Sequence, residues 1–122
     1  MVTNFFQIQS QETFLYKVLG EYLSSNEVEL VKKAYKMADK AHTGQFRKSG
    51  EAYISHPLSV ALILADLKLD YLCIVAAILH DCIEDTSVTK DEVRNQFGDQ
   101  VAHIVEGVSK LTNLEFTSSS QK

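Results

Sequence analysis

The stretch YLCIVAAILHDCI, residues 71–83, decides the fold of this chain. Every position as far as residue 79 carries an apolar side chain or a tyrosine, so a helix here is apolar around nearly its whole circumference. A helix of this kind lies at the centre of a domain, where other elements cover it. Asp70 stands directly before it and can cap its first turn. The stretch predicts a buried central helix that ends in the polar pair His80-Asp81.

Helical patterns also lie on both sides of this segment. The sequence predicts further helices over about residues 12–23, from Asn26 to His42, from Pro57 to about residue 67, from Thr89 to Phe97, and from Asp99 onward. Asn26 and Glu29 have the spacing of a capping box. Thr89 and Glu92 repeat that spacing, and Pro57 suits the first position of its helix. Because the sequence has no strand-like alternation and no internal repeat, we expect an all-α fold.

Length and charge limit what the chain can be. Its 122 residues make one domain or a part of one. The formal net charge of -4 argues against direct nucleic-acid binding, although a few local cations still suffice to hold a small phosphate ligand. No apolar run approaches the roughly 20 residues of a membrane span, and no secretory signal precedes the first helix. We therefore expect a cytoplasmic protein without membrane contact.

The two cysteines fit a reducing compartment. Cys73 and Cys82 lie nine positions apart on the central helix, so they point to opposite faces and cannot form a disulfide within it. We expect both to be small buried apolar side chains.

The pair His80-Asp81 is the strongest chemical feature. Two polar ligating groups at the end of a buried helix need partners, and imidazole with carboxylate suits a divalent metal of the Mn²⁺, Fe²⁺ or Zn²⁺ type. An isolated His-Asp pair is also common as a hydrogen-bonded structural pair. Glu84 lies four residues after His80, and Asp85 lies four residues after Asp81. Each of these two pairs shares a helix face if the helix continues. A carboxylate beside a metal can deprotonate a bound water.

The other histidines differ in promise. His56, directly before Pro57, lies at the start of its helix, where packing can direct it toward His80, and it is the third candidate ligand. His42 ends its helix and is expected to support the following loop. His103 is expected on an outer face.

The loop GQFRKSGEAYI, residues 44–54, offers a second kind of chemistry. Arg47 and Lys48 supply adjacent cations, and Ser49 supplies a hydroxyl next to the flexible backbone of a glycine. These groups suit phosphates or a purine ring stacked on a guanidinium. The alternative interpretation is a solvated charged loop.

Together these residues resemble the N-terminal hydrolase domain of the RelA/SpoT family, the bacterial stringent-response enzymes. The matching segments are AHTGQFRKSGEAYISHPLSVALILADLKLD (41–70), AAILHDCIEDT (76–86) and FGDQVAHIVEGVSKL (97–111), and the similarity covers about residues 28–114. The spaced combination of RKSGE, HP and HDxxEDT carries the resemblance, since no single piece is specific. It implies an HD-superfamily helical bundle that removes the 3′-pyrophosphate from the guanine nucleotide alarmones ppGpp and pppGpp, with Mn²⁺ as the usual metal.

By position, the resemblance implies three groups of site residues. His56, His80 and Asp81 match three metal ligands of the family. Glu84 and Asp85 match the acidic pair that activates the attacking water. The loop that holds the guanine nucleotide is matched by Arg47, Lys48 and Ser49.

Some positions depart from the family pattern. Ala52 replaces a usual proline and Cys82 a usual valine, and neither position carries a ligand. The intact HD and ED pairs imply a hydrolase-competent copy. The family's fourth ligand is an aspartate on a later helix, whereas this sequence has no aspartate after Asp99. Glu106 or Glu115 would have to replace it.

These departures lead to an interpretation of the chain as a fragment. We expect residues 1–122 to be an HD hydrolase domain truncated on its C-terminal side, with an N-terminal helical segment over 1–25 and a polar tail over 117–122. The synthetase and regulatory domains would belong to a SpoT-like parent. Alone, the chain is expected to be marginally stable, prone to self-association through its uncovered central helix, and nearly inactive. The alternatives are another HD-type nucleotide phosphohydrolase, and an inactive fragment that binds guanine nucleotide without turnover.

Overall fold

The computed structural model describes residues 5–46, 50 and 52–108, and within them the chain is helical with no β-strand. The helices are α1 (Phe5–Gly20), α2 (Ser25–Ala41), α3 (Ser55–Asp66), α4 (Tyr71–Leu79), α5 (Cys82–Asp85) and α6 (Lys90–Phe97). Residues 99–108 are helical as well. The all-α prediction is confirmed. None of the described helices is both long and apolar enough to cross a bilayer.

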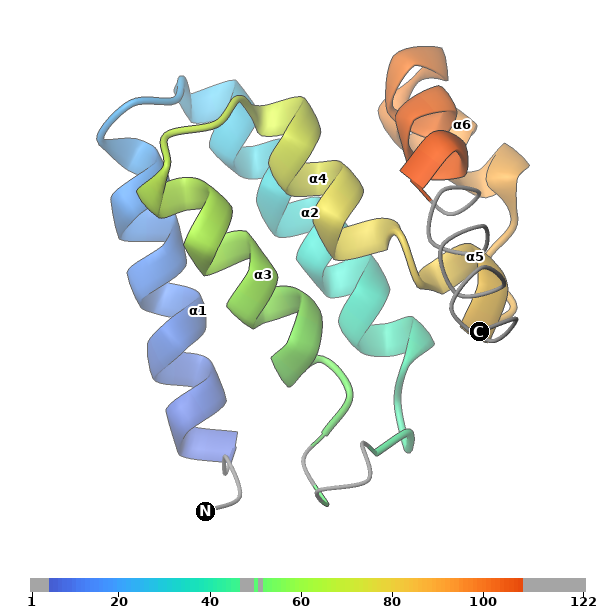
Figure 1. Cartoon of the computed structure of the whole chain (residues 1–122), viewed down its shortest axis with the longest axis horizontal. Coiled ribbons are helices and arrows are strands. Elements are labelled where there is room, and N and C mark those ends of the chain that lie inside the picture. Colours follow the sequence, from blue (N-terminus) through green and yellow to red (C-terminus); the bar gives the residue numbers. More distant parts are fainter. Residues whose placement is uncertain (1–4, 47–49, 51, 109–122) are drawn as a thin grey trace, which may run out of the picture.

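Helices α1 to α4 form a bundle whose centre is the predicted apolar helix. Helix α4 packs against α2 and α3, and α1 packs against α3 and α2 (Figure 1). Helix α5 follows the end of α4, and both α5 and α6 lie on the side away from α1 (Figure 1). The buried residues of α4 are Ile74, Val75, Ala76, Ile78 and Leu79. The sequence-based expectation that this helix is left uncovered is therefore wrong, because α2 and α3 enclose it.

Three helix boundaries agree with the sequence. The Asp70 side chain accepts a hydrogen bond from the Cys73 backbone at 3.0 Å and caps α4. Thr89 and Glu92 form the predicted capping box of α6, which is followed by Gly98 at a φ of 98°. Local capping chemistry decides each of these ends, so it can be predicted from the sequence.

The starts of the first three helices differ from the prediction. Helix α1 begins at Phe5 rather than near residue 12, since Ile8 extends its buried face into a polar segment. The capping box of α2 uses Ser24 and Glu27 rather than Asn26 and Glu29. Helix α3 begins at Ser55, which makes Pro57 its third residue. Proline is tolerated there because the first-turn N–H groups have no partner within the helix.

Two polar expectations also need correction. Asp99 does not cap the last helix but is already part of it, and the Ala102 backbone donates to the carbonyl of Gly98. The Asp99 carboxylate instead accepts from Arg94 Nε at 2.9 Å. Cys82 is buried as expected, whereas Cys73 is exposed, and neither forms a disulfide.

Candidate metal centre

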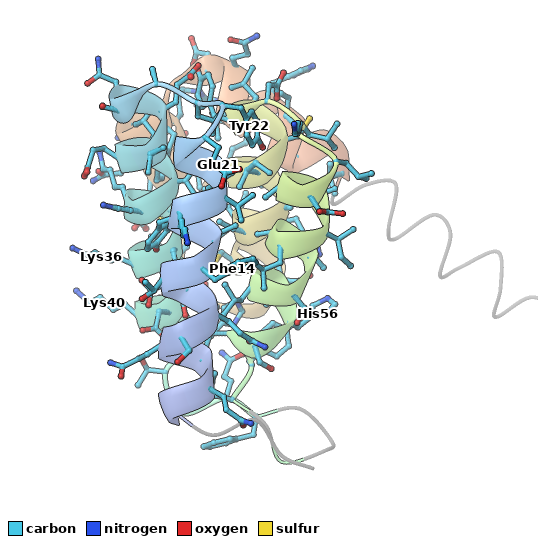
Figure 2. The ribbon with its side chains drawn as sticks, turned by 90° about the vertical axis from the view of Figure 1, so that its left-hand side faces the viewer. Phe14, Glu21, Tyr22, Lys36, Lys40 and His56 are labelled. Carbon is cyan, nitrogen blue, oxygen red and sulfur yellow. The ribbon has the colours of Figure 1, made fainter. Side chains whose placement is uncertain are left out.

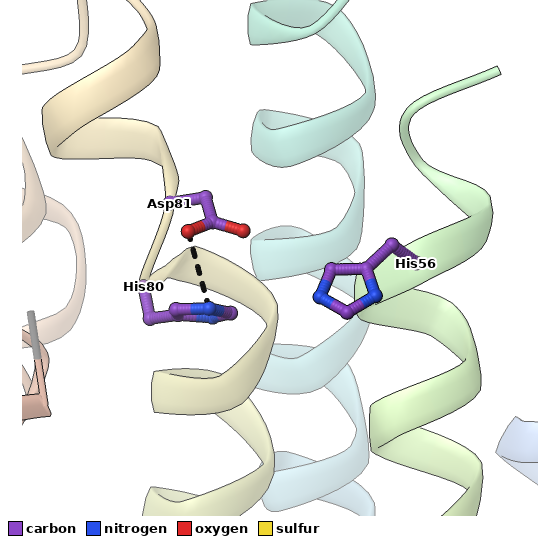
Figure 3. Close-up of side chains that lie close together, drawn as sticks. All are labelled: His56, His80 and Asp81. Atoms are coloured by element: carbon purple, nitrogen blue, oxygen red, sulfur yellow. Dashed lines mark ion pairs between the residues drawn. The ribbon is translucent and has the colours of Figure 1, made fainter. Parts of the chain in front are cut away.

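Three of the predicted site residues converge where α3 meets the end of α4. His56 is the second residue of α3, and His80 and Asp81 form the junction between α4 and α5. One ligand atom from each lies within 4.8 Å of the others (Figure 3). Two ligands at about 2.0–2.2 Å from one ion stand at most about 4.4 Å apart, so small side-chain rotations are enough to close this set around a metal.

The hydrogen bond to the backbone fixes the tautomer of His80. Its Nδ1 lies 2.7 Å from the carbonyl oxygen of Ala77, one turn earlier in the chain. A carbonyl oxygen only accepts, so Nδ1 carries the proton and donates it. The other nitrogen, Nε2, is therefore the one available to bind a metal, as in many histidine ligands oriented by an outer partner.

The carboxylate of Asp81 has a different partner on each oxygen. Its Oδ1 lies 3.2 Å from His80 Nε2, while Oδ2 accepts a hydrogen bond of 2.7 Å from the Tyr53 hydroxyl. With Nδ1 protonated, Nε2 of a neutral His80 presents a lone pair to the lone pairs of Oδ1. Two acceptors at this distance repel unless a proton or a cation lies between them.

The donor set suits a divalent cation. Two imidazoles and a carboxylate are ligands that Mn²⁺, Fe²⁺ and Zn²⁺ accept. The side chains of His80 and Asp81 are 17% and 15% exposed, so the site is largely desolvated yet open to an ion and a substrate. The ring centroids of His56 and His80 lie 6.4 Å apart at an interplanar angle of 62°. The three residues form a candidate divalent-metal site.

The acidic pair after the junction has a changed context. Helix α4 ends at Leu79 and α5 begins at Cys82, so the helix does not continue as the shared-face argument required. The condition on which the shared helix face depended is therefore not met, because two residues separate α4 from α5. Glu84 and Asp85 lie in α5, and their side chains fall outside the described residues.

The two glutamates considered as replacements for the fourth ligand are not found at the candidate centre in the described residues. Glu106 forms an ion pair with Lys90 rather than joining the three converging residues. Glu115 and the predicted polar tail lie outside the part of the chain that the structure describes.

The predicted nucleotide loop is described only at its ends. Arg47, Lys48 and Ser49 lie outside the described residues. On either side of them, Phe46 and Ala52 form an isolated antiparallel bridge. The Tyr53 backbone donates to the carbonyl of Gln45 at 3.0 Å, which closes the base of the loop beside the metal ligands.

His42 has the supporting position that the sequence suggested. It is 3% exposed, its Nδ1 lies 3.1 Å from Gln45 Oε1, and its ring stacks on Tyr53 with centroids 4.4 Å apart. His103 is exposed, as expected.

Sequence reasoning missed Tyr53. A tyrosine at the end of a polar loop has no pattern that points to a ligand 28 positions later. Only its spacing of one turn before His56 offers a signal, since that spacing places both rings on the same side of the incipient helix. Their centroids are 6.3 Å apart.

Comparison with known proteins places this geometry in a family. Residues 34–122 match the family model of the HD domain. The chain belongs to the HD domain family. It is 47% identical over 107 residues to the bifunctional (p)ppGpp synthase/hydrolase SpoT of Escherichia coli K12. The aligned region covers 88% of this chain and 15% of that protein.

Two further relatives show how wide the similarity is. The chain is 48% identical over 101 residues to a GTP pyrophosphokinase of Myxococcus xanthus, covering 83% of the chain and 13% of that protein. It is 45% identical over 109 residues to a guanosine-3′,5′-bis(diphosphate) 3′-pyrophosphohydrolase of Aquifex aeolicus, covering 89% and 15%. The resemblance to the RelA/SpoT family is confirmed, and the chain spans about 15% of the length of these relatives.

Proposed function

We propose that this domain hydrolyses the 3′-pyrophosphate of ppGpp and pppGpp in a metal-dependent reaction, as part of stringent-response control. The observation that carries the proposal is the convergence of His56, His80 and Asp81, whose ligand atoms lie within 4.8 Å of one another. Within this set, His80 Nε2 faces Asp81 Oδ1 at 3.2 Å. The names of the relatives support the substrate, since several are guanosine-3′,5′-bis(diphosphate) 3′-pyrophosphohydrolases. These names favour an alarmone over the nucleotide of another HD-type phosphohydrolase.

The reaction breaks one phosphorus–oxygen bond and forms another. The oxygen of a water molecule attacks the phosphorus next to the ribose, the bond from that phosphorus to the 3′-oxygen breaks, and the 3′-oxygen leaves with a proton. The products are GDP or GTP and pyrophosphate. A bound Mn²⁺ would lower the pKa of a coordinated water and screen the phosphate charge.

The residues of this chain divide the remaining work. His56, His80 and Asp81 would hold the metal, and the proton on His80 Nδ1 stays hydrogen-bonded to the Ala77 carbonyl, so that Nε2 is the nitrogen available as a ligand. Glu84 accepts the proton of the attacking water, with Asp85 beside it in α5.

The nucleotide is held by the loop. Arg47 and Lys48 bind its phosphates or stack on the guanine, and Ser49 donates a hydrogen bond. The bridge of Phe46 and Ala52 at the base of the loop comes four residues before His56, the second residue of α3. The protein acts on a free nucleotide in the cytoplasm, without nucleic acid or membrane as a partner. In a longer parent, synthetase and regulatory domains accompany it.

The test is a turnover assay on ppGpp with added Mn²⁺ and with chelator, following pyrophosphate release. In an active, full-length parent, Glu84→Gln should lower the rate by roughly 10²–10⁴-fold while Mn²⁺ affinity stays the same, because the amide keeps the shape and loses the proton acceptor. His103→Gln is the matched control, since it alters an exposed side chain outside the candidate centre. Release of pyrophosphate that is indifferent to Mn²⁺ and to Glu84→Gln would refute the proposal. Nucleotide binding without any release would favour the binding-only alternative.

A further inference from the structure

The Tyr53 hydroxyl is the outer partner of the Asp81 carboxylate. The carboxylate can only accept, so the 2.7 Å hydrogen bond to Oδ2 runs from the tyrosine. The second oxygen, Oδ1, is then the one that faces His80. One oxygen is thus held by the protein and the other is directed at the candidate centre.

The tyrosine ring is itself held by contacts that do not involve Asp81. It stacks on the buried ring of His42 at an interplanar angle of 27°. Its backbone is bonded to Gln45, whose side chain also meets His42. The imidazole of His42 lies against Cys82, with Nε2 and Sγ 3.8 Å apart. The hydroxyl is therefore presented from a fixed position rather than by a freely rotating side chain.

We propose that Tyr53 is a positioning residue, which holds Asp81 Oδ2 so that Oδ1 alone is offered to the metal beside His56 and His80. This inference rests on the proposed metal centre and deepens it. A carboxylate without this hydrogen bond can turn about its terminal torsion and offer both oxygens. Outer partners of metal ligands typically change metal affinity about 10–100-fold when they are removed.

The variant that isolates the effect is Tyr53→Phe. It keeps the ring that stacks on His42 and removes only the hydroxyl. The matched control is Tyr22→Phe, because the Tyr22 hydroxyl donates a hydrogen bond of the same length, 2.7 Å, to the carbonyl of Leu69. Tyr22 lies toward the opposite end of the bundle from His56 (Figure 2).

The measurements are Mn²⁺ affinity by titration calorimetry and the visible spectrum of the Co²⁺-loaded chain, with urea unfolding as a check on stability. We expect Tyr53→Phe to weaken Mn²⁺ binding about 10–100-fold and to alter the Co²⁺ bands, which report the ligand geometry. Tyr22→Phe should match the wild type in affinity and spectrum. In an Asp81→Ala background, Tyr53→Phe should have no further effect on affinity, because it acts through that carboxylate.

The outcomes separate this inference from the proposed function. If His80→Ala loses metal affinity while Tyr53→Phe retains wild-type affinity and an unchanged Co²⁺ spectrum, the metal centre stands and the positioning role is overturned. If neither His80→Ala nor Asp81→Ala weakens Mn²⁺ binding, the proposed centre itself fails. A loss of affinity in Tyr53→Phe that persists undiminished on the Asp81→Ala background also overturns the role.

Discussion

At the scale of single residues, the chemistry of the site depends on which atoms carry protons. The hydrogen bond from His80 Nδ1 to the Ala77 carbonyl occupies one of the two imidazole nitrogens. The hydrogen bond from the Tyr53 hydroxyl occupies one of the two carboxylate oxygens of Asp81. What remains is one imidazole nitrogen and one carboxylate oxygen, 3.2 Å apart, between which a proton or a cation can lie. Two ordinary hydrogen bonds thereby orient the atoms of the candidate metal centre.

Arg47 is the residue for which we predict a pure binding effect. Arg47→Ala should weaken alarmone binding by about 1–3 kcal/mol if, as proposed, the guanidinium both stacks on the base and pairs with phosphate. The measurements are the dissociation constant of ppGpp and the rate constant at saturating substrate. Lys36→Ala is the control, since it removes a cation from the outer part of α2 (Figure 2). A fall in the saturated rate with unchanged affinity would contradict the binding role.

At the scale of elements, the sequence predicts what local chemistry decides. The cap at Asp70 and the box of Thr89 and Glu92 follow from short-range spacing and are where the sequence puts them. The sequence expects the buried helix to end at His80-Asp81, but the separate helix α5 that begins at Cys82 does not follow from spacing, because Cys82 and Ile83 resume the apolar pattern. That break depends on tertiary packing, which no local rule contains.

Some residues of the candidate site can likewise be predicted from the sequence, and others cannot. His56 and His80 could be paired in advance because the residue types and the likeness to a family pointed to them. Tyr53 could not, since its role comes from the path of the loop, which ends with the bridge of Phe46 and Ala52. A hydrogen bond across 28 residues is a property of the folded chain and leaves no periodic trace in the sequence.

Replacing Gly98, which follows α6, and Gly20, which ends α1, by alanine should change the free energy of unfolding in opposite directions. A Cβ added at Gly98 or Gly20 meets nothing within 4 Å, so space is equal at both. Gly98 has φ 98° and ψ 167°, a region for glycine alone, and Gly98→Ala should lower the unfolding free energy by about 1–3 kcal/mol. Gly20→Ala, at the end of α1, should raise it by up to about 1 kcal/mol. Urea denaturation checks both. Equal losses at both positions would contradict the conformational explanation.

At the scale of the whole molecule, the exposed apolar surface is not where the sequence suggested. Helix α4 is enclosed, whereas Phe14, Ile63 and Leu67 are 57%, 62% and 63% exposed. They line a groove of about 540 Å³ between α1 and α3. Phe14 projects from α1 on the face shown in Figure 2. Of the exposed large apolar side chains in the described part of the chain, three line this groove and only Phe46 does not, so we expect self-association driven by apolar surface to use the groove.

A charge placed in the groove tests that conclusion. We expect the chain to self-associate with rising concentration, and Ile63→Lys to weaken the association, because burying a lysine there is unfavourable. Sedimentation velocity over a concentration series is the measurement. Asn95→Lys adds the same charge on an exposed position of α6 and should leave the association unchanged. A monomer at every concentration, or equal effects of both variants, would show that the groove has no such role.

The base of the loop has a further consequence through Tyr53. The same residue is hydrogen-bonded to Gln45 at the foot of the proposed nucleotide loop and to Asp81 at the candidate metal centre. If both sites bind as proposed, Tyr53 connects them, and we expect the two binding equilibria to be linked, with a reciprocal linkage. Guanosine, which has no phosphate to touch a metal, should bind more tightly in the presence of Mn²⁺, and Mn²⁺ more tightly in the presence of guanosine, by one common factor. Calorimetric titrations in both orders measure that factor, and Tyr53→Phe should bring it close to one.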